Sequence, residues 1–140
     1  MTSSTENQTT TARVMATFLN RLGEQDAEGI EELFADQIDW FVPGSRALPW
    51  TGSRSRREQV ADYFHTLWSA FVPGRSTATV DKVVIDGDEA VVFSRFSHTV
   101  ERNGRRLETP AVLRLTIANG QIMRMHLYED TLAVDEAFKD

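Results

Sequence analysis

The fold class of this chain is decided by residues 77–129, with the sequence TATVDKVVIDGDEAVVFSRFSHTVERNGRRLETPAVLRLTIANGQIMRMHLYE. Four segments in this stretch have the apolar–polar alternation of strands: Thr77–Ile85, Ala90–Val100, Leu107–Ile117 and Ile122–Glu129. Compact turns containing Gly87, Gly104 and Gly120 join them, and their Asp-Gly and Asn-Gly pairs are strong hairpin signals because both residue types tolerate positive φ. The pattern predicts an antiparallel meander of four strands.

The residues before the meander predict three helices and one further strand. Val14, Phe18 and Leu22 recur at helical spacing, and Asp26 is typical of the N-cap of a second helix. An apolar stripe over residues 60–71 indicates the third helix, and residues 38–42 have the sequence of a short extra strand. We therefore expect an α+β fold: a cone-shaped, curved antiparallel sheet (the four-strand meander plus the short extra strand), covered by three N-terminal helices and enclosing one pocket.

The composition limits the kinds of partner that the chain can bind and its expected location in the cell. The 140 residues carry 21 acidic and 15 basic groups, a net charge of −6, and this disfavours nucleic acid or an anionic membrane as a partner. Residues 1–11 are polar and predict a disordered N-terminal lead that has neither the basic start nor the apolar run of a signal peptide. We expect one domain over residues 12–140 and a cytoplasmic location.

Strand alternation sorts the side chains of the meander into two faces. The more apolar face, which we expect to turn toward the helices and the pocket, carries Phe96, His98, Leu113, Met123, Met125, Leu127 and Glu129. Ile122 and Arg124 fall on the opposite face. Glu129 and His98 are thus two polar groups among apolar ones.

Glu129 and His98 are the candidate catalytic residues. Burial on an apolar face raises the pKa of a carboxyl group toward neutrality, where it can move a proton, and an imidazole suits the same work. The alternative for Glu129 is a solvated position at the end of its strand. The alternative for His98 is a hydrogen-bonded core histidine without a catalytic role.

Aromatic and apolar side chains supply the candidate substrate-binding set. Aromatic rings on elements that should converge on the pocket suit a ring-containing ligand. The set is Phe18, Trp40, Trp50, Tyr63, Phe96, Leu113, Met125 and Leu127.

No metal site and no cofactor are predicted. The chain has no cysteine, and its three histidines stand far apart in the sequence without a carboxylate at ligand spacing. Its glycines lie in turns rather than in a phosphate-binding loop, and no nucleophile-elbow motif is present.

Several stretches of the chain match a known family: residues 18–22 with Asp26, residues 30–36, residues 39–44, residues 50–52, residues 119–122 and residues 128–130. In these the chain resembles the SnoaL-like, ketosteroid-isomerase-related branch of the nuclear transport factor 2-like superfamily. The resemblance implies the cone-shaped fold, but this fold hosts isomerases, cyclases, epoxide hydrolases, dehydratases and non-enzymes.

The functional residues of the family carry over poorly. A ketosteroid isomerase would have a tyrosine in place of Phe18, its general-base aspartate near Val42 and its oxyanion-holding aspartic acid near Leu113. A limonene-epoxide-hydrolase relative would have a catalytic aspartate near Leu127. All four positions are apolar here, so the resemblance does not imply the standard ketosteroid isomerase mechanism.

Three functions remain open from the sequence. The first is an enzyme of cyclase, isomerase or dehydratase type, performing cofactor-independent acid–base chemistry on a small, mainly apolar or aromatic molecule. The second is a non-catalytic protein that binds such a molecule. The third is a protein-interaction module, or a homodimer, that uses the outer sheet face with Arg95, Arg114, Arg124, His126 and Tyr128.

Overall fold

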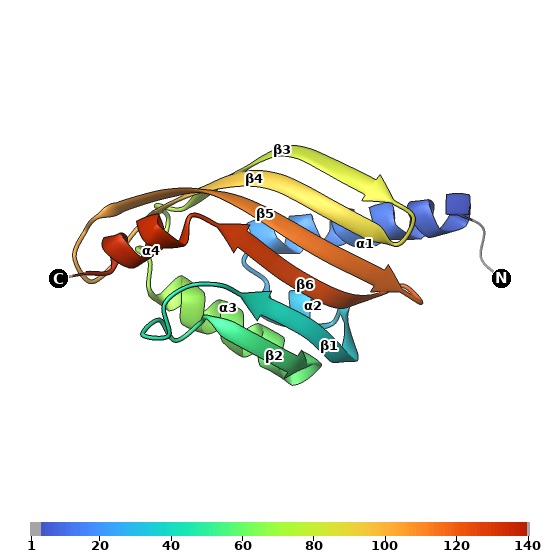
Figure 1. The fold of residues 1–140 in the computed structure, drawn as a ribbon, viewed down its shortest axis with the longest axis horizontal. Helices are drawn as coiled ribbons and strands as arrows, with labels where there is room; N and C mark the ends of the chain where they lie inside the picture. The colour runs from blue at the N-terminus through green and yellow to red at the C-terminus, as the bar shows by residue number, and fades with distance from the viewer. Residues whose placement is uncertain (1–3, 140) are drawn as a thin grey trace.

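The structure is a computed structural model that describes residues 4–139. These residues form a curved six-stranded sheet with the strand order β2-β1-β6-β5-β4-β3 (Figure 1). The strands are β1 (Phe34–Val42), β2 (Gly52–Arg56), β3 (Thr77–Asp86), β4 (Glu89–Thr99), β5 (Arg106–Ala118) and β6 (Gln121–Glu129). The four predicted meander segments correspond to β3, β4, β5 and β6, and the α+β fold class is confirmed.

The sheet has two features that the sequence did not indicate. β1 pairs with β6 in parallel, with Asp39 opposite Arg124 and Trp40 opposite Met125, so the sheet is mixed rather than purely antiparallel. β2 is an additional edge strand that pairs with β1. Its sequence, Gly-Ser-Arg-Ser-Arg, has no apolar alternation, and this explains why it could not be predicted.

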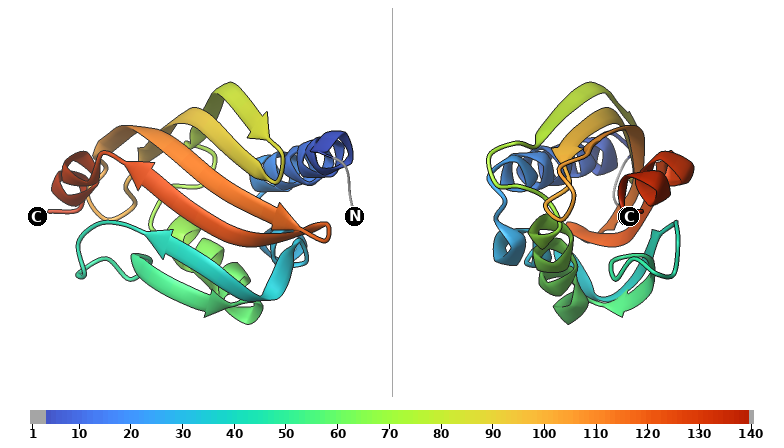
Figure 2. Two further views of the ribbon diagram at one scale, coloured as in Figure 1. Left: turned by 45° about the vertical axis from the view of Figure 1, so that its right-hand side comes forward. Right: turned by 90° about the vertical axis from the view of Figure 1, so that its left-hand side faces the viewer.

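The first three helices lie within the curve of the sheet, and the fourth follows β6 at the end of the sheet (Figure 1). They are α1 (Ser4–Gly23), α2 (Ala27–Glu31), α3 (Val60–Ser69), which follows the 3-10 turn η1 (Arg57–Gln59), and the C-terminal α4 (Thr131–Ala137). Figure 2 shows the sheet bending around α1 and α3. The predicted N-cap of α2 is confirmed, because Asp26 Oδ1 accepts a hydrogen bond from the backbone N–H of Gly29 at 3.0 Å.

Helix α1 begins earlier than the sequence suggested. Residues 4–11, part of the predicted disordered lead, are helical, whereas residues 1–3 lie outside the described residues. Tertiary contacts explain the difference: the Thr11 hydroxyl donates a hydrogen bond to Gly87 O at 2.8 Å, and the Gln8 amide donates one to Ile85 O at 3.3 Å. These bonds fix a polar segment that has no apolar stripe of its own.

A bulge in β6 overturns the predicted orientation of Met123. Thr116 lies opposite Arg124 but Ile117 lies opposite Ile122, so Met123 is an extra residue between the two pairs. As a result Met123 is 38% exposed, while Ile122, expected on the outer face, is fully buried. Beyond the bulge the predicted alternation holds, with Met125 and Leu127 buried.

The core fills the space between sheet and helices. Its largest fully buried side chains include those of Phe18, Phe34, Trp40 and Leu115. None of the helices described is both long and apolar enough to cross a membrane.

Candidate functional site

Two adjacent chambers lie between the helices and the concave face of the sheet. The outer chamber has a volume of about 340 Å³, and the inner chamber has a volume of about 40 Å³. The wall that both share consists of Tyr63, Leu67, Phe96, His98 and Leu127. The outer volume lies at the lower end of the range of small-molecule sites, and the inner one has room for a single small group.

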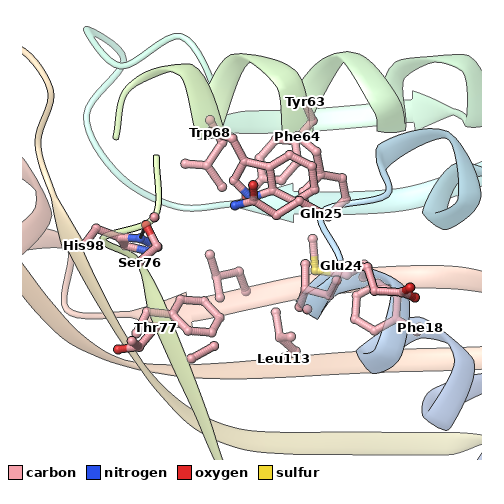
Figure 3. Close-up of a pocket in the computed structure, with 18 residues that line it drawn as sticks. Phe18, Glu24, Gln25, Tyr63, Phe64, Trp68, Ser76, Thr77, His98 and Leu113 are labelled. Carbon is pink, nitrogen blue, oxygen red and sulfur yellow. Dashed lines mark hydrogen bonds between the residues drawn. The ribbon is translucent and has the colours of Figure 1, made fainter. Parts of the chain in front are cut away.

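The outer chamber is mainly aromatic and apolar (Figure 3). Phe18 and Leu22 come from α1, Phe64 and Trp68 from α3, and Leu113 and Met125 from β5 and β6. Its polar lining includes Glu24 and Gln25, in the turn after α1, and Ser76 and Thr77, where the chain enters β3, in addition to Tyr63 and His98 in the shared wall.

The inner chamber is enclosed by the ends of several elements. Trp50 comes from the loop between β1 and β2, Phe71 from the segment after α3, and Thr109 from β5. Glu129 stands at the end of β6, where the chain passes into α4. The curvature of the sheet therefore brings residues that are as far apart in the sequence as Trp50 and Glu129 to one small space.

Nine of the ten predicted site residues line a chamber. Phe18, Leu113 and Met125 line the outer one only, Trp50 and Glu129 the inner one only, and Tyr63, Phe96, His98 and Leu127 both. The structure thus brings Glu129 and His98 together in the wall of the inner chamber.

Trp40 is the exception. It is 1% exposed and lines neither chamber, because its indole ring packs in the core with its centroid 4.7 Å from that of Tyr63 and 6.0 Å from that of Phe64. Its Nε1–H has no hydrogen-bond partner among the described residues. Trp40 therefore packs against Tyr63 on the side away from the chambers and cannot contact a ligand in either of them.

The Glu129 carboxyl group is the one acidic group among the described residues that line the inner chamber. Burial raises its pKa to about 7, and the neighbouring charge of Asp130 acts in the same direction. Within residues 4–139 no side chain forms an ion pair or hydrogen bond with this carboxyl group. It can therefore be found protonated or ionised at neutral pH.

His98 is neutral over the same pH range. Burial lowers its pKa to about 4. Its Nδ1 lies 2.8 Å from Ser76 Oγ, and its ring stacks on that of Phe71. Nε2 has no hydrogen-bond partner in the described part of the chain, so one ring nitrogen remains available to a ligand.

Tyr63 lines both chambers, and the charge of Glu129 acts on its hydroxyl group. Burial raises the pKa of its hydroxyl group, and the charge of Glu129 adds to this effect, so Tyr63 remains protonated. The guanidinium carbon of Arg54 lies 5.0 Å from the centroid of the Tyr63 ring, and Arg54 donates a hydrogen bond to Trp50 O at 3.0 Å. Arg54 itself lines neither chamber.

The sequence did not reveal the polar mouth of the outer chamber. Gln25 has φ of 53°, a left-handed backbone conformation uncommon for a residue with a side chain, and this turn directs Glu24 and Gln25 to the lining (Figure 3). Gly23, the residue at which α1 ends, was a usable sequence signal for that turn. Ser76 lies in an irregular segment, and no pattern in the sequence marked it.

A metal site does not emerge among residues 4–139, where no group of three His, Asp or Glu side chains could hold an ion.

A comparison with protein families found a match to the model described as "SnoaL-like domain" over residues 15–125. No curated protein matches the chain. The family match confirms the resemblance inferred from the sequence.

Solved structures with the same fold are numerous. An NTF2-like protein of unknown function from Burkholderia pseudomallei is 16% identical, with a TM-score of 0.84 and coverage of 94% of this chain and 98% of that one. TerC, crystallised with polyporic acid, is 18% identical with a TM-score of 0.78, and the match covers 91% of this chain and 97% of TerC. A candidate SnoaL-like polyketide cyclase from Jannaschia sp. CCS1 is 20% identical with a TM-score of 0.76, covering 93% and 92% of the two chains. At these identities the likeness concerns the fold.

Proposed function

The chain belongs to the SnoaL-like domain family, and from this premise we propose that it is an enzyme that performs acid–base chemistry without a cofactor. Its substrate is a small, mainly apolar molecule that contains a ring. The reaction is of the cyclisation, isomerisation or dehydration type, in which a proton leaves one atom of the substrate and another atom receives one.

The observation that carries the proposal is the state of Glu129. A general acid–base group works best when its pKa lies near the working pH, because it then gives and takes a proton with similar ease. Glu129 meets this condition through burial, which raises its pKa to about 7, and it faces a chamber with room for one small group. We assign the proton transfer to its carboxylate oxygens.

His98 would act beside Glu129 as a neutral hydrogen-bonding group. An imidazole with a pKa of about 4 carries no charge at pH 7, so it can hold a carbonyl or hydroxyl oxygen without competing for the proton of Glu129. Its free Nε2 offers this contact, while Ser76 fixes Nδ1.

The two chambers suit a molecule with two parts. The ring would lie in the outer chamber against Phe18, Phe64 and Trp68, and its reacting polar substituent would reach past the shared wall to Glu129. TerC, which has the same fold, was crystallised with polyporic acid, and this supports the use of the fold for small organic ligands.

A non-catalytic binding function is the second candidate, and one observation favours it. Glu129 lines the inner chamber only, so a ligand confined to the outer chamber would not touch it. Such a ligand would be held by aromatic walls and released unchanged.

The test measures proton exchange rather than a specific product. Wild-type protein is incubated in D₂O with a panel of cyclic ketones, and deuterium uptake at the carbons next to the carbonyl is followed by NMR. General acid–base groups contribute about 10²- to 10⁴-fold, so Glu129→Gln should slow the exchange by at least about 10²-fold. Glu108→Gln, at an exposed position of β5, is the matched control and should leave the rate unchanged.

Exchange that is equally fast in Glu129→Gln would remove Glu129 from the mechanism. Ketones that bind to the wild-type protein but exchange no faster than in buffer would favour the binding function.

A further inference from the structure

The charges of the two chambers are all of one sign. Among the described residues that line them, the carboxyl groups are those of Glu24 in the outer chamber and Glu129 in the inner chamber, and none is Lys or Arg. The other polar lining residues are neutral: Gln25, Tyr63, Ser76, Thr77, His98 and Thr109. A negatively charged ligand would thus find hydrogen-bonding groups but no counter-charge.

The groups that surround Glu129 add no positive charge to the inner chamber. Tyr63 faces it from α3 with its hydroxyl group protonated, and His98 faces the same chamber from β4 in the neutral form. Asp130, the next residue, adds negative charge. The cation Arg54 lies against the ring of Tyr63, outside both linings.

We infer that the site selects its ligands by charge: it accepts ring compounds whose polar substituent is neutral or a basic amine, and it rejects those that carry a carboxylate. This inference rests on the proposed function and specifies the substrate class of the same site.

The physical reason is the cost of removing an anion from water without a partner. A carboxylate in the inner chamber would lose its hydration and lie beside Glu129, so that either it or Glu129 would have to bind a proton. A hydroxyl or carbonyl group avoids this cost and can hydrogen-bond to Glu129 or His98. An ammonium group would gain most, because it forms an ion pair with the ionised form of Glu129.

Size alone could also exclude a carboxylate, because the inner chamber has a volume of only about 40 Å³. The two causes are separable. Glu129→Gln keeps the shape of the side chain and removes its charge, so it abolishes discrimination by charge but preserves discrimination by size.

The experiment uses three probes that share one ring system: 2-naphthylmethylamine, 2-naphthylmethanol and 2-naphthoate. Their dissociation constants are measured by isothermal titration calorimetry at about pH 8, where most of the Glu129 side chain is ionised. We expect the amine to bind at least about tenfold more tightly than the carboxylate, with the alcohol between them. In Glu129→Gln this ratio should fall at least about fivefold, whereas Glu108→Gln should retain it.

A second measurement uses the wild-type protein alone. Lowering the pH to about 5.5 protonates Glu129, so the amine should lose affinity and the carboxylate should gain it; His98 remains neutral there. The inference is overturned if the carboxylate binds as tightly as the amine, if Glu129→Gln preserves their ratio, or if none of the three probes binds at millimolar concentration. Binding that follows charge as expected, together with failure of the deuterium exchange, would retain this inference and reject the catalytic function.

Discussion

The imidazole ring of His98 stacks on the phenyl ring of Phe71, with ring centroids 4.0 Å apart and planes inclined by 12°. Phe71 is itself attached to the sheet by a β-bridge to Val100, the residue that follows β4. The stack covers one face of the imidazole and shields it from water, and burial of this kind is what lowers the pKa of His98 to about 4.

Removal of the Phe71 ring should reverse this effect. In Phe71→Ala water reaches the imidazole, so we expect the pKa of His98 to rise from about 4 toward its ordinary value of 6.5. An NMR titration of the His98 ring resonances measures it. Ser76→Ala, which keeps the stack and removes only the hydrogen bond to Nδ1, should raise the pKa less. A His98 pKa that stays near 4 in Phe71→Ala would show that other walls of the chamber bury the ring.

The buried carboxyl group of Glu129 should make the protein less stable as the pH rises. Between its ordinary pKa of 4.5 and its folded-state pKa of about 7, Glu129 keeps a proton in the folded protein that it has lost in the unfolded chain. Stability therefore falls with pH across this window. Relative to wild type, Glu129→Gln should gain on the order of 2 kcal/mol of unfolding free energy between about pH 4.5 and 8, as measured by urea denaturation.

His98 should impose the opposite slope. Its folded-state pKa of about 4 lies below the ordinary 6.5, so between these values the unfolded chain holds the extra proton, and the native state loses stability as the pH falls. Relative to wild type, His98→Gln should gain stability between about pH 6.5 and 4, as followed by the same denaturation series. Glu108→Gln should follow the wild-type curve. Parallel curves for all the variants would contradict the burial of both groups.

A bulky side chain at the mouth of the outer chamber should block ligands without unfolding the protein. Ala78 lines this chamber from the edge strand β3 and is exposed, so Ala78→Trp adds an indole where there is space to accept it. Binding of 2-naphthylmethanol should weaken at least about tenfold. Thr79→Trp is the matched control, because Thr79 lies opposite Arg95 on the other face of β3. Equal affinities in the two variants would place the binding site elsewhere.

The outer face of the sheet should mediate a homodimer. Phe93, Val112 and Tyr128 stand opposite one another on three adjacent strands, and Phe93 and Tyr128 are 41% and 53% exposed. An apolar row of this kind suits burial against a second copy of the same face. Light scattering should report a dimer that Phe93→Lys converts to a monomer, whereas Leu132→Lys, an exposed apolar position on α4, should leave it intact. A monomeric wild-type protein at high concentration would contradict this prediction.

Much of the architecture could be predicted because local signals agreed with one another. The turns at Gly87, Gly104 and Gly120 fixed the strand order of the meander, and alternation within β4 placed Phe96 and His98 on the side of the chambers. Six of the nine proposed site residues that line a chamber lie on β4, β5 and β6, and they could be identified because residues that alternate on one face of a curved sheet converge on its concave side.

The remaining differences come from interactions that are not local. The bulge at Met123 is an irregularity of pairing between β5 and β6, and one extra residue is enough to turn a side chain outward. The helical state of residues 4–11 depends on contacts of Gln8 with Ile85 in β3 and of Thr11 with Gly87 in the turn after it, more than seventy positions away in the chain. In the sequence, Trp40 and Trp50 are equally good candidates for a pocket lining. In the structure Trp40 packs against Tyr63 in the core, whereas Trp50 lines the inner chamber.

The parallel pairing of β1 with β6 also bears on how the protein is made. Asp39 and Arg124, whose side chains form an ion pair at 3.0 Å across these strands, are separated by 85 positions in the chain. A ribosome therefore releases β1 long before its partner exists, and meanwhile β3, β4 and β5 can already form hairpins among themselves. Synthesis and assembly thus follow different orders, because a strand produced early joins the sheet only when β6 has emerged, and such long-range pairing is the slow step expected for this topology.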